Sequence, residues 1–302
     1  MRILILGGDG MLGHSFFVHL GSVKARPDVR VTLRQEMKAY QAYGIFTPAN
    51  AFACIDARSI ERLVEVLAEF QPEVVINCVG IVKQRSAAKE SIPCLELNAL
   101  LPHRLAILCK MIGARLVHLS TDCVFSGNKG NYTEDDVMDA VDLYGRTKAL
   151  GEVHEKHCLT IRTSSVGYEL GSQKGLLEWF LSQRGPVNGF VNAIYTGLAT
   201  PELSRVVESL IFDYPSACGL YQISGNPINK YELLTLFKRI LNHPIEVIPE
   251  GRFRCDRSLD SRRFRKEFSY APPSWEAMIE SLKANNRNNY VLESNDHRGH
   301  TP

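Results

Sequence analysis

Tyr144 and Lys148, four positions apart in the segment YGRTK, could together transfer a proton. On a helix, residues i and i+4 share one face, so the lysine ammonium would lie beside the phenol. A phenol has a reference pKa of about 10, and a neighbouring cation lowers it toward the range where the group exchanges protons near neutrality. The same spacing also occurs by chance on solvated helices, so it needs support from elsewhere in the chain.

Ser120-Thr121-Asp122 gives that support, because it ends the apolar segment 115–120, which is predicted to be a buried strand. Parallel strands deliver the residues at their carboxyl ends to one ligand-binding edge of the sheet. A hydroxyl at this edge could hydrogen-bond the same substrate carbonyl oxygen as the phenol. Together these residues predict reduction or oxidation at a C–O centre.

A second motif, Gly7-Gly8-Asp9-Gly10-Met11-Leu12-Gly13, follows the apolar run 2–6 and opens a predicted helix. Glycines there permit a tight turn, close approach of the backbone to a pyrophosphate, and close packing of helix on strand. An ordinary glycine-rich turn is the alternative. The position after an N-terminal buried strand favours dinucleotide binding. The predicted contacts are Gly7, Gly10, Met11, Leu12 and Gly13.

The end of the second predicted strand, 29–33, carries Arg34 in place of the acidic residue that would bind the ribose hydroxyls of NAD. An arginine suits a 2′-phosphate, so the sequence favours NADPH over NADH. The alternative is an exposed loop cation. Asp56, after the third predicted strand, is placed either to meet the adenine edge or to cap the helix that begins near residue 58.

Strands and helices alternate from the first residue, which predicts an α/β fold of the Rossmann type, with a doubly wound parallel sheet. Strands are predicted at 2–6, 29–33, 53–56, 73–80 and 115–120, and helices at 12–20, 58–70 and 94–112. We expect an NAD(P)-binding domain over 1–166, with a later segment near 187–215 as a candidate to return to it. Residues 167–284 are expected to form mainly a smaller α/β substrate lobe, and 285–302 a disordered tail. In the lobe, helices are predicted near 174–184, from 201, at 229–241 and at 272–284, and strands at 219–224 and 245–249.

Composition excludes several classes of protein. The 302 residues carry 35 basic and 33 acidic side chains, a net charge of +2, so neither nucleic acid nor a membrane is an expected partner. No apolar run approaches the length of about 18 residues that a membrane span needs. The eight cysteines form no CxxC pair and the histidines show no metal spacing, so we expect a cytoplasmic protein with reduced thiols and no metal.

The glycine turn, Asn98, LSTDCVFSG (119–127), YGRTKALGE (144–152) and IRTS (161–164) together resemble the extended short-chain dehydrogenase/reductases. Within that superfamily they are most similar to the dTDP-4-dehydrorhamnose reductase family, which acts on nucleotide-linked 4-keto-6-deoxy sugars. The resemblance covers most of residues 1–200. It implies an NADPH-dependent 4-ketoreductase of deoxysugar and polysaccharide precursor biosynthesis.

The resemblance also implies roles for individual residues. Thr121, Tyr144 and Lys148 would be catalytic, with Lys148 also binding the nicotinamide ribose. The cofactor cleft would include Val79, Gly80, Ile81 and Thr163, and the substrate side Thr121, Asp122, Cys123, Phe125, Tyr144 and Ser165. Asn98 would support the lysine through a water-mediated network, or else it caps a break in the long helix.

Several departures from the family pattern fall on the substrate wall. Cys123 and Ser126 replace a tyrosine and an aspartate, and Ser165 stands where an aromatic residue would contact the sugar. These changes suggest a related and bulkier substrate, such as a UDP-N-acetyl-hexos-4-ulose. The arginine-rich stretch 252–265 could face a nucleotide diphosphate or form a solvated, internally paired surface.

Two other functions stay open at this point. One is a sugar-nucleotide epimerase of the same superfamily, whereas a 4,6-dehydratase would usually carry a glutamate where Cys123 stands. The other is a non-catalytic NADP-binding regulatory subunit on the same fold. A homodimer is the expected assembly.

Overall fold

A seven-stranded parallel sheet forms the larger part of the protein. The computed structural model describes residues 1–82, 90–171 and 174–285, so the predicted tail lies outside the described residues apart from residue 285. The sheet has the order β10-β6-β5-β4-β1-β2-β3. Its strands are β1 (Arg2–Leu6), β2 (Asp28–Thr32), β3 (Ala51–Phe52), β4 (Val74–Asn77), β5 (Arg115–Thr121), β6 (Cys158–Thr163) and β10 (Gly219–Gln222). The order reverses between β1 and β4, which is where such sheets bind ligands.

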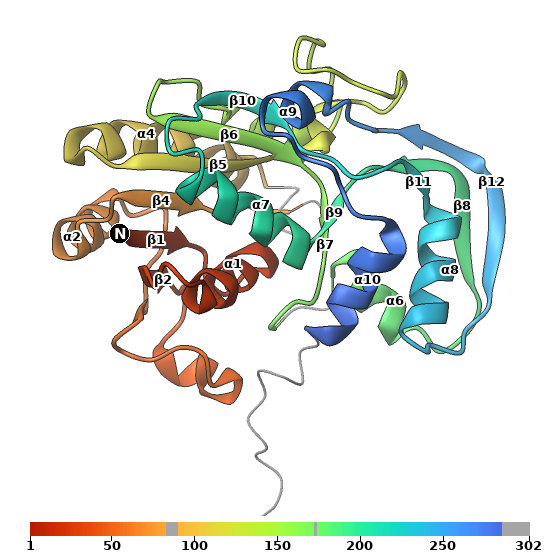
Figure 1. Ribbon diagram of the computed structural model, residues 1–302, viewed down its shortest axis with the longest axis horizontal. Helices are drawn as coiled ribbons and strands as arrows, with labels where there is room; N and C mark the ends of the chain where they lie inside the picture. Colours follow the sequence, from red (N-terminus) through yellow and green to blue (C-terminus); the bar gives the residue numbers. More distant parts are fainter. Residues whose placement is uncertain (83–89, 172–173, 286–302) are drawn as a thin grey trace, which may run out of the picture.

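Helices cover both faces of this sheet, which explains why its inner strands read as continuous apolar runs. In β1, Ile3 and Ile5 pack into one buried cluster, whereas Leu4 and Leu6 pack into another on the opposite face. Helices α1 (Met11–Ser22) and α7 (Thr200–Phe212) cover the first face, and α2 (Ile60–Phe70) and α4 (Leu101–Ile112) the second (Figure 1). The sequence therefore predicted the Rossmann-type fold correctly.

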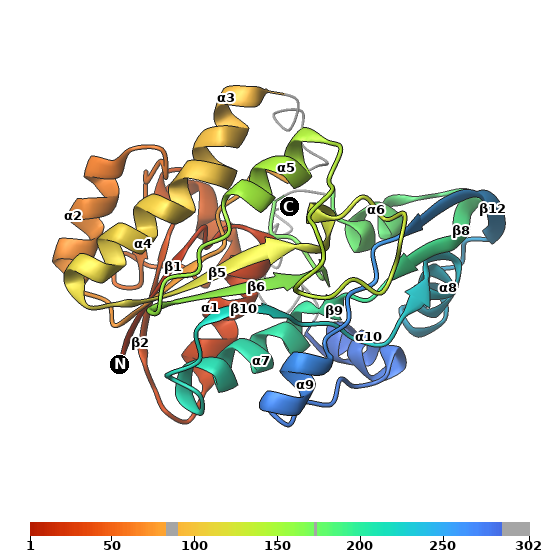
Figure 2. The same ribbon diagram turned by 90° about the horizontal axis from the view of Figure 1, so that it is seen from above.

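One long helical stretch crosses the second face. It consists of α3 (Ser91–Cys94), the π-helical segment η3 (Leu95–Leu100) and α4, and it ends at Gly113 with φ +70°. By length and composition alone, Ser91–Ile112 could cross a membrane, but 44% of its apolar window is buried inside the protein. Leu101, Leu105 and Cys109 pack on the sheet, as in the core helix of a globular protein. Helix α5 (Leu143–Leu150) lies beside it (Figure 2).

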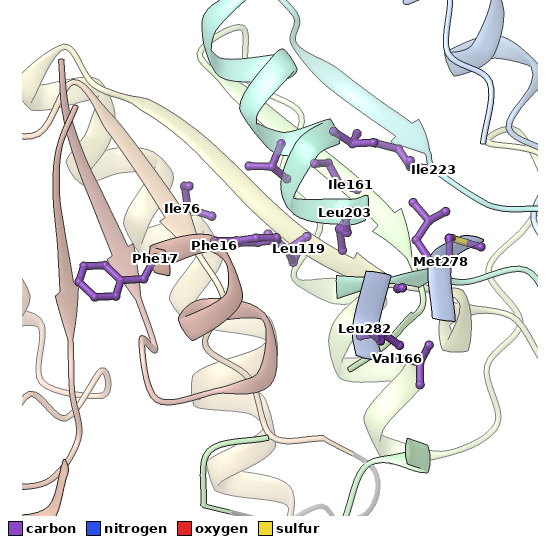
Figure 3. Packing of buried hydrophobic residues seen from close by; sticks show 14 of the residues in the cluster. Phe16, Phe17, Ile76, Leu119, Ile161, Val166, Leu203, Ile223, Met278 and Leu282 are labelled. Carbon is purple, nitrogen blue, oxygen red and sulfur yellow. The ribbon is translucent and has the colours of Figure 1, made fainter. Parts of the chain in front are cut away.

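A smaller lobe is built around the three-stranded sheet β11-β8-β12. Its elements are α6 (Leu176–Ser182), β8 (Val187–Tyr195), β11 (Ile228–Asn229), α8 (Lys230–Ile240), β12 (Val247–Asp256) and α10 (Trp275–Ala284). Helix α9 (Arg262–Glu267) lies between the last two of these in the chain but packs against β10 of the main sheet. A short pair, β7 (Ser165–Val166) with β9 (Leu198–Ala199), links it to the main sheet. One hydrophobic cluster runs through both parts, from Phe16 on α1 past Leu203 on α7 to Met278 on α10 (Figure 3).

The structure corrects two expectations about these elements and divides the segment named in a third. The third strand is Ala51–Phe52 and not 53–56, because Cys54 has φ 58°, a left-handed conformation that extended strands do not contain. Strand 219–222 joins the edge of the main sheet beside β6 and does not belong to the lobe. Of the segment 187–215, helix α7 packs against α1, whereas β8 is the central strand of the smaller sheet.

Candidate active site

The glycine-rich turn between β1 and α1 is shaped by contacts that only glycine permits. Gly7 has φ +81° and accepts the N–H of Gly10 at 3.1 Å. A Cβ on Gly13 would lie 2.0 Å from the Gly7 carbonyl oxygen, and one on Gly8 would lie 2.5 Å from Cβ of Val31. The helix therefore starts directly against the strand, with its N–H groups turned toward the edge of the sheet. This cradle fits the pyrophosphate of a dinucleotide.

Gly13→Ala tests this close packing. We expect the added methyl to force α1 away from β1 and to lower the free energy of unfolding by ~1–3 kcal/mol. Gly21→Ala on the same helix is the matched control, because its Cβ would meet nothing within 4 Å. That substitution should raise stability by ~0.5–1 kcal/mol through helix propensity. Urea unfolding of both variants gives the comparison, and equal effects would contradict the packing argument.

Two acidic side chains lie at the predicted cofactor edge of the sheet, one in the glycine turn and one after β3. Asp9 accepts a hydrogen bond from the Tyr40 hydroxyl at 2.8 Å, and burial raises the pKa of Tyr40 to about 12. Asp56 is paired with the guanidinium of Arg58, which holds the pKa of the carboxyl below its usual range. The cap of α2 is Ser59, so Asp56 does not fill the capping role that the sequence left open. Arg34 is exposed just beyond β2.

The predicted catalytic residues converge where β5 ends against α5. Thr121 is the last residue of β5, and its side chain lies close enough to the Tyr144 hydroxyl to influence its pKa. Lys148, one turn along α5, is buried and donates from Nζ to the Leu119 carbonyl oxygen at 2.6 Å. A Cβ on Gly145 would lie 2.2 Å from the Cys123 carbonyl oxygen, so the glycine after the tyrosine brings the helix this close.

Burial determines the protonation of both groups. It lowers the pKa of Lys148 to about 8, while the Glu152 carboxylate acts in the opposite direction. It also raises the pKa of Tyr144 above its ordinary value, and hydrogen bonding to Thr121 opposes that rise. In the ligand-free protein, Tyr144 therefore keeps its proton at neutral pH and can donate it.

Asn98 lies in the π-helical segment and joins three parts of the site. Its Oδ1 accepts the N–H of Ile81 at 2.8 Å, and its Nδ2 donates to the Ile81 carbonyl oxygen and to Thr147 Oγ1, at 3.1 and 3.2 Å. Asn98 therefore fixes the turn after β4 and, through Thr147, the helix that carries Lys148. The side chain does not cap a break in the long helix, because its hydrogen-bond partners in the described part of the chain lie on other segments.

A buried ion pair behind the predicted catalytic residues was missed in the sequence. Arg162 donates to both carboxylate oxygens of Glu152 at 2.7 and 2.8 Å, and the two side chains are only 3% and 1% exposed. Ser120 donates to the same carboxylate at 2.7 Å. The pair thus connects the ends of β5, β6 and α5. A charged residue inside the otherwise buried strand CLTIRT was the available signal, because such a charge requires a partner.

The expected substrate residues lie in different surroundings. Asp122 and Cys123 follow Thr121 directly and act electrostatically on Tyr144, and burial raises the pKa of Asp122 while Arg257 opposes that rise. Ser165 lies in β7, opposite Leu198, and it is the neighbouring Ser164 that hydrogen-bonds Asp122. Phe125, however, is fully buried and stacks on Tyr132 at 4.1 Å between ring centroids, so its side chain does not line the substrate side as expected.

Two other predicted positions have defined partners. Thr163 is buried and donates to the Ile223 carbonyl oxygen at 2.8 Å, so its hydroxyl is already engaged. In the arginine-rich stretch, Arg262 pairs with Asp260, and Arg257 donates to the Phe125 carbonyl oxygen at 2.8 Å. Arg252 and Arg254 lie exposed on β12, away from these contacts.

Comparison with known proteins places this site in a family. Residues 1–186 match the family described as "RmlD substrate binding domain". The spore coat polysaccharide biosynthesis protein SpsK of Bacillus subtilis is 30% identical over 246 residues, which are 76% of this chain and 84% of that protein. The dTDP-4-dehydrorhamnose reductase of Bacillus anthracis, solved in complex with NADP, is 21% identical and superposes with a TM-score of 0.75. That alignment covers 94% of this chain and 99% of the solved one.

A different kind of relative covers part of the chain. Methionine adenosyltransferase 2 subunit beta of Xenopus tropicalis is 35% identical over 206 residues, which are 63% of this chain and 60% of that protein.

Proposed function

The chain belongs to the RmlD substrate-binding-domain family, and we propose that it is a nicotinamide-dependent reductase of a nucleotide-linked 4-keto-6-deoxy sugar. The observation that carries the proposal is the convergence of Thr121, Tyr144 and Lys148 at the end of β5, at the same edge of the sheet as the glycine cradle that follows β1. Deoxysugar and polysaccharide precursor biosynthesis is the corresponding process. The likeness to SpsK and to the reductase of B. anthracis supports the assignment.

Each catalytic side chain has a separate task in this proposal. The bound nicotinamide cofactor supplies the hydride. Tyr144 donates its proton to the oxygen of the sugar carbonyl as negative charge develops there. Thr121 hydrogen-bonds the same oxygen, and the Lys148 ammonium favours loss of the phenolic proton and holds the nicotinamide ribose. Asn98 holds helix α5 and the turn at 79–81 in fixed positions relative to each other, through its hydrogen bonds to Thr147 and Ile81.

The cofactor is NADPH in preference to NADH. Arg34 supports this choice, since it is an exposed cation directly beyond β2, where a 2′-phosphate would lie. The backbone of 7–13 would hold the pyrophosphate, and 79–81 would lie along the nicotinamide side. The NADP complex of the B. anthracis reductase is consistent with this assignment.

The nucleotide and sugar are the least defined part of the proposal. Cys123 and Ser165 leave more room than the larger residues expected there, which supports a bulky substrate such as a UDP-N-acetyl-hexos-4-ulose. A screen of dTDP-, UDP-, GDP- and CDP-linked 4-keto sugars with NADPH tests this, with the product at C4 identified by NMR. Oxidation of NADPH with at least one of these sugars is expected, and oxidation with none would contradict the proposal.

The buried lysine predicts a pH dependence. Because burial lowers the pKa of Lys148 to about 8, the ammonium is present below that pH and is lost above it. We expect kcat/KM for NADPH, which reports on the free enzyme, to fall above pH 8 by about tenfold per pH unit. A profile that stays flat between neutrality and the ordinary pKa of a lysine would contradict the role of Lys148.

Two rivals remain to be distinguished. An epimerase of the same superfamily would form product without net consumption of the cofactor. A regulatory subunit would bind the dinucleotide without any turnover, and the similarity to methionine adenosyltransferase 2 subunit beta favours testing it. The retained geometry of Thr121, Tyr144 and Lys148 supports the reductase over the regulatory subunit.

The protein is further proposed to be a cytoplasmic homodimer. All eight cysteines are free thiols, which suits a reducing compartment. The long helical stretch α3-η3-α4 and helix α5 beside it expose several large apolar side chains, including Met111 at 77%, and such faces are commonly covered by a partner. These residues are Ile92, Leu100, Ile107, Met111 and Leu150. Light scattering by the full chain tests the assembly.

A further inference from the structure

Asp9 is a carboxylate inside the glycine-rich turn, and a hydrogen bond fixes its direction. The Tyr40 hydroxyl donates to Asp9 Oδ2 at 2.8 Å and accepts the backbone N–H of Gln35 at 3.1 Å. Tyr40 is itself buried and meets Phe46 edge to face, with 5.8 Å between ring centroids. The carboxylate is therefore held against the segment that follows β2 and is not free to turn into solvent.

The turn itself brings Asp9 to that place. The N–H of Gly8 donates to the Thr32 carbonyl oxygen at 2.9 Å, and the N–H of Gly7 donates to Thr32 Oγ1 at 3.1 Å. Residue 9 thus follows a backbone segment that is tied to the last residue of β2, only two positions before Arg34. In Rossmann folds, the end of β2 next to the glycine turn binds the adenosine ribose with its 2′-hydroxyl or 2′-phosphate. We call this place the ribose corner.

Two opposite charges share the ribose corner, since both Arg34 and Asp9 act electrostatically on the Tyr40 hydroxyl. A phosphate monoester carries about two negative charges near neutrality, so Arg34 attracts it and Asp9 repels it. A ribose 2′-hydroxyl, by contrast, is neutral and can donate to a carboxylate.

We propose that Asp9 is a cofactor-selecting residue. Arg34 favours NADPH over NADH, and Asp9 makes this preference smaller. Tyr40 is its positioning residue. The inference rests on the proposed function only in requiring that the chain binds a nicotinamide dinucleotide.

The test is a set of dissociation constants for NADPH and NADH, measured by calorimetry on the full chain without any sugar. Asp9→Asn keeps an oxygen that can accept from Tyr40, so the turn should persist. We expect this variant to raise the affinity for NADPH relative to NADH by about tenfold, and Arg34→Gln to lower it by a similar factor. Asp28→Asn is the matched control, because Asp28 lies at the opposite end of β2 and pairs with Arg30. The ratio of its dissociation constants for NADPH and NADH should equal that of the wild type.

The outcomes separate this inference from the proposed function. If both dinucleotides bind and Asp9→Asn leaves their ratio unchanged or lowers it, the role of Asp9 is wrong while the reductase assignment stands. If neither dinucleotide binds to the wild type or to any variant, both proposals are overturned.

Discussion

Tyr144→Phe is expected to lower kcat with a 4-keto sugar nucleotide by about 10²–10⁴-fold, the usual contribution of a positioned general acid. The substitution removes only the hydroxyl that lies close to Thr121, and it leaves the ring and the helix α5 in place. Affinity for NADPH should stay nearly unchanged, because the proposed cofactor contacts lie on the glycine turn, Arg34 and Lys148. Steady-state kinetics and calorimetric binding of NADPH supply the two readouts.

The separation of the two readouts makes this result informative. Thr121→Val should reduce kcat as well, but by a smaller factor, because Thr121 hydrogen-bonds the oxygen without supplying the proton. If Tyr144→Phe consumes NADPH at the wild-type rate, another group must donate the proton. Equal losses of turnover and NADPH affinity would instead point to a damaged fold.

Glu152→Gln is expected to cause the largest loss of stability, ~3–5 kcal/mol, because it leaves the charge of Arg162 buried without a counter-charge. That loss is a large part of the ~5–15 kcal/mol by which domains are ordinarily stable. The matched control is Glu65→Gln on α2, whose carboxylate pairs with Arg62 on the surface. Surface pairs contribute at most ~1 kcal/mol, so the control should unfold at nearly the wild-type urea concentration.

A double variant distinguishes the buried charge from mere loss of a contact. Removing both charges with Glu152→Gln and Arg162→Met should cost less than Glu152→Gln alone, because no charge then remains unpaired. If the double variant is less stable than the wild type by the sum of the losses measured for Glu152→Gln and for Arg162→Met singly, the ion-pair explanation is wrong.

The parts of the site that could be predicted from the sequence depend on local spacing. The turn after β1 needs only a buried strand followed by glycines, and Tyr144 with Lys148 needs only helical periodicity. The need of Arg162 for a buried partner could be predicted, but not that the partner is Glu152, because the two meet only through the pairing of β6 with β5 and the end of α5. Phe125 was misplaced for a similar reason, since its burial depends on Tyr132 and on the distant Leu259.

The same distinction holds for the fold. The long buried strands were predicted because each contains a continuous apolar run, and such runs are typical of strands covered on both faces. The two-residue β3 has no such run, and its position depends on the backbone pairing of Val31 and Thr32 with Ala51 and Phe52. Strand β10 joins the sheet edge next to β6 after a stretch of more than fifty residues, and neither its composition nor its periodicity indicates that neighbour.

The central claim is that this site reduces a sugar carbonyl at the expense of a nicotinamide cofactor. The most direct measurement follows NADPH oxidation and the amount of C4 alcohol formed in one reaction with the sugar nucleotide that the screen selects. The account predicts one NADPH consumed for each alcohol formed. Product that accumulates without net consumption of NADPH would contradict the account and identify an epimerase, and NADPH binding with no product from any sugar would identify a regulatory subunit.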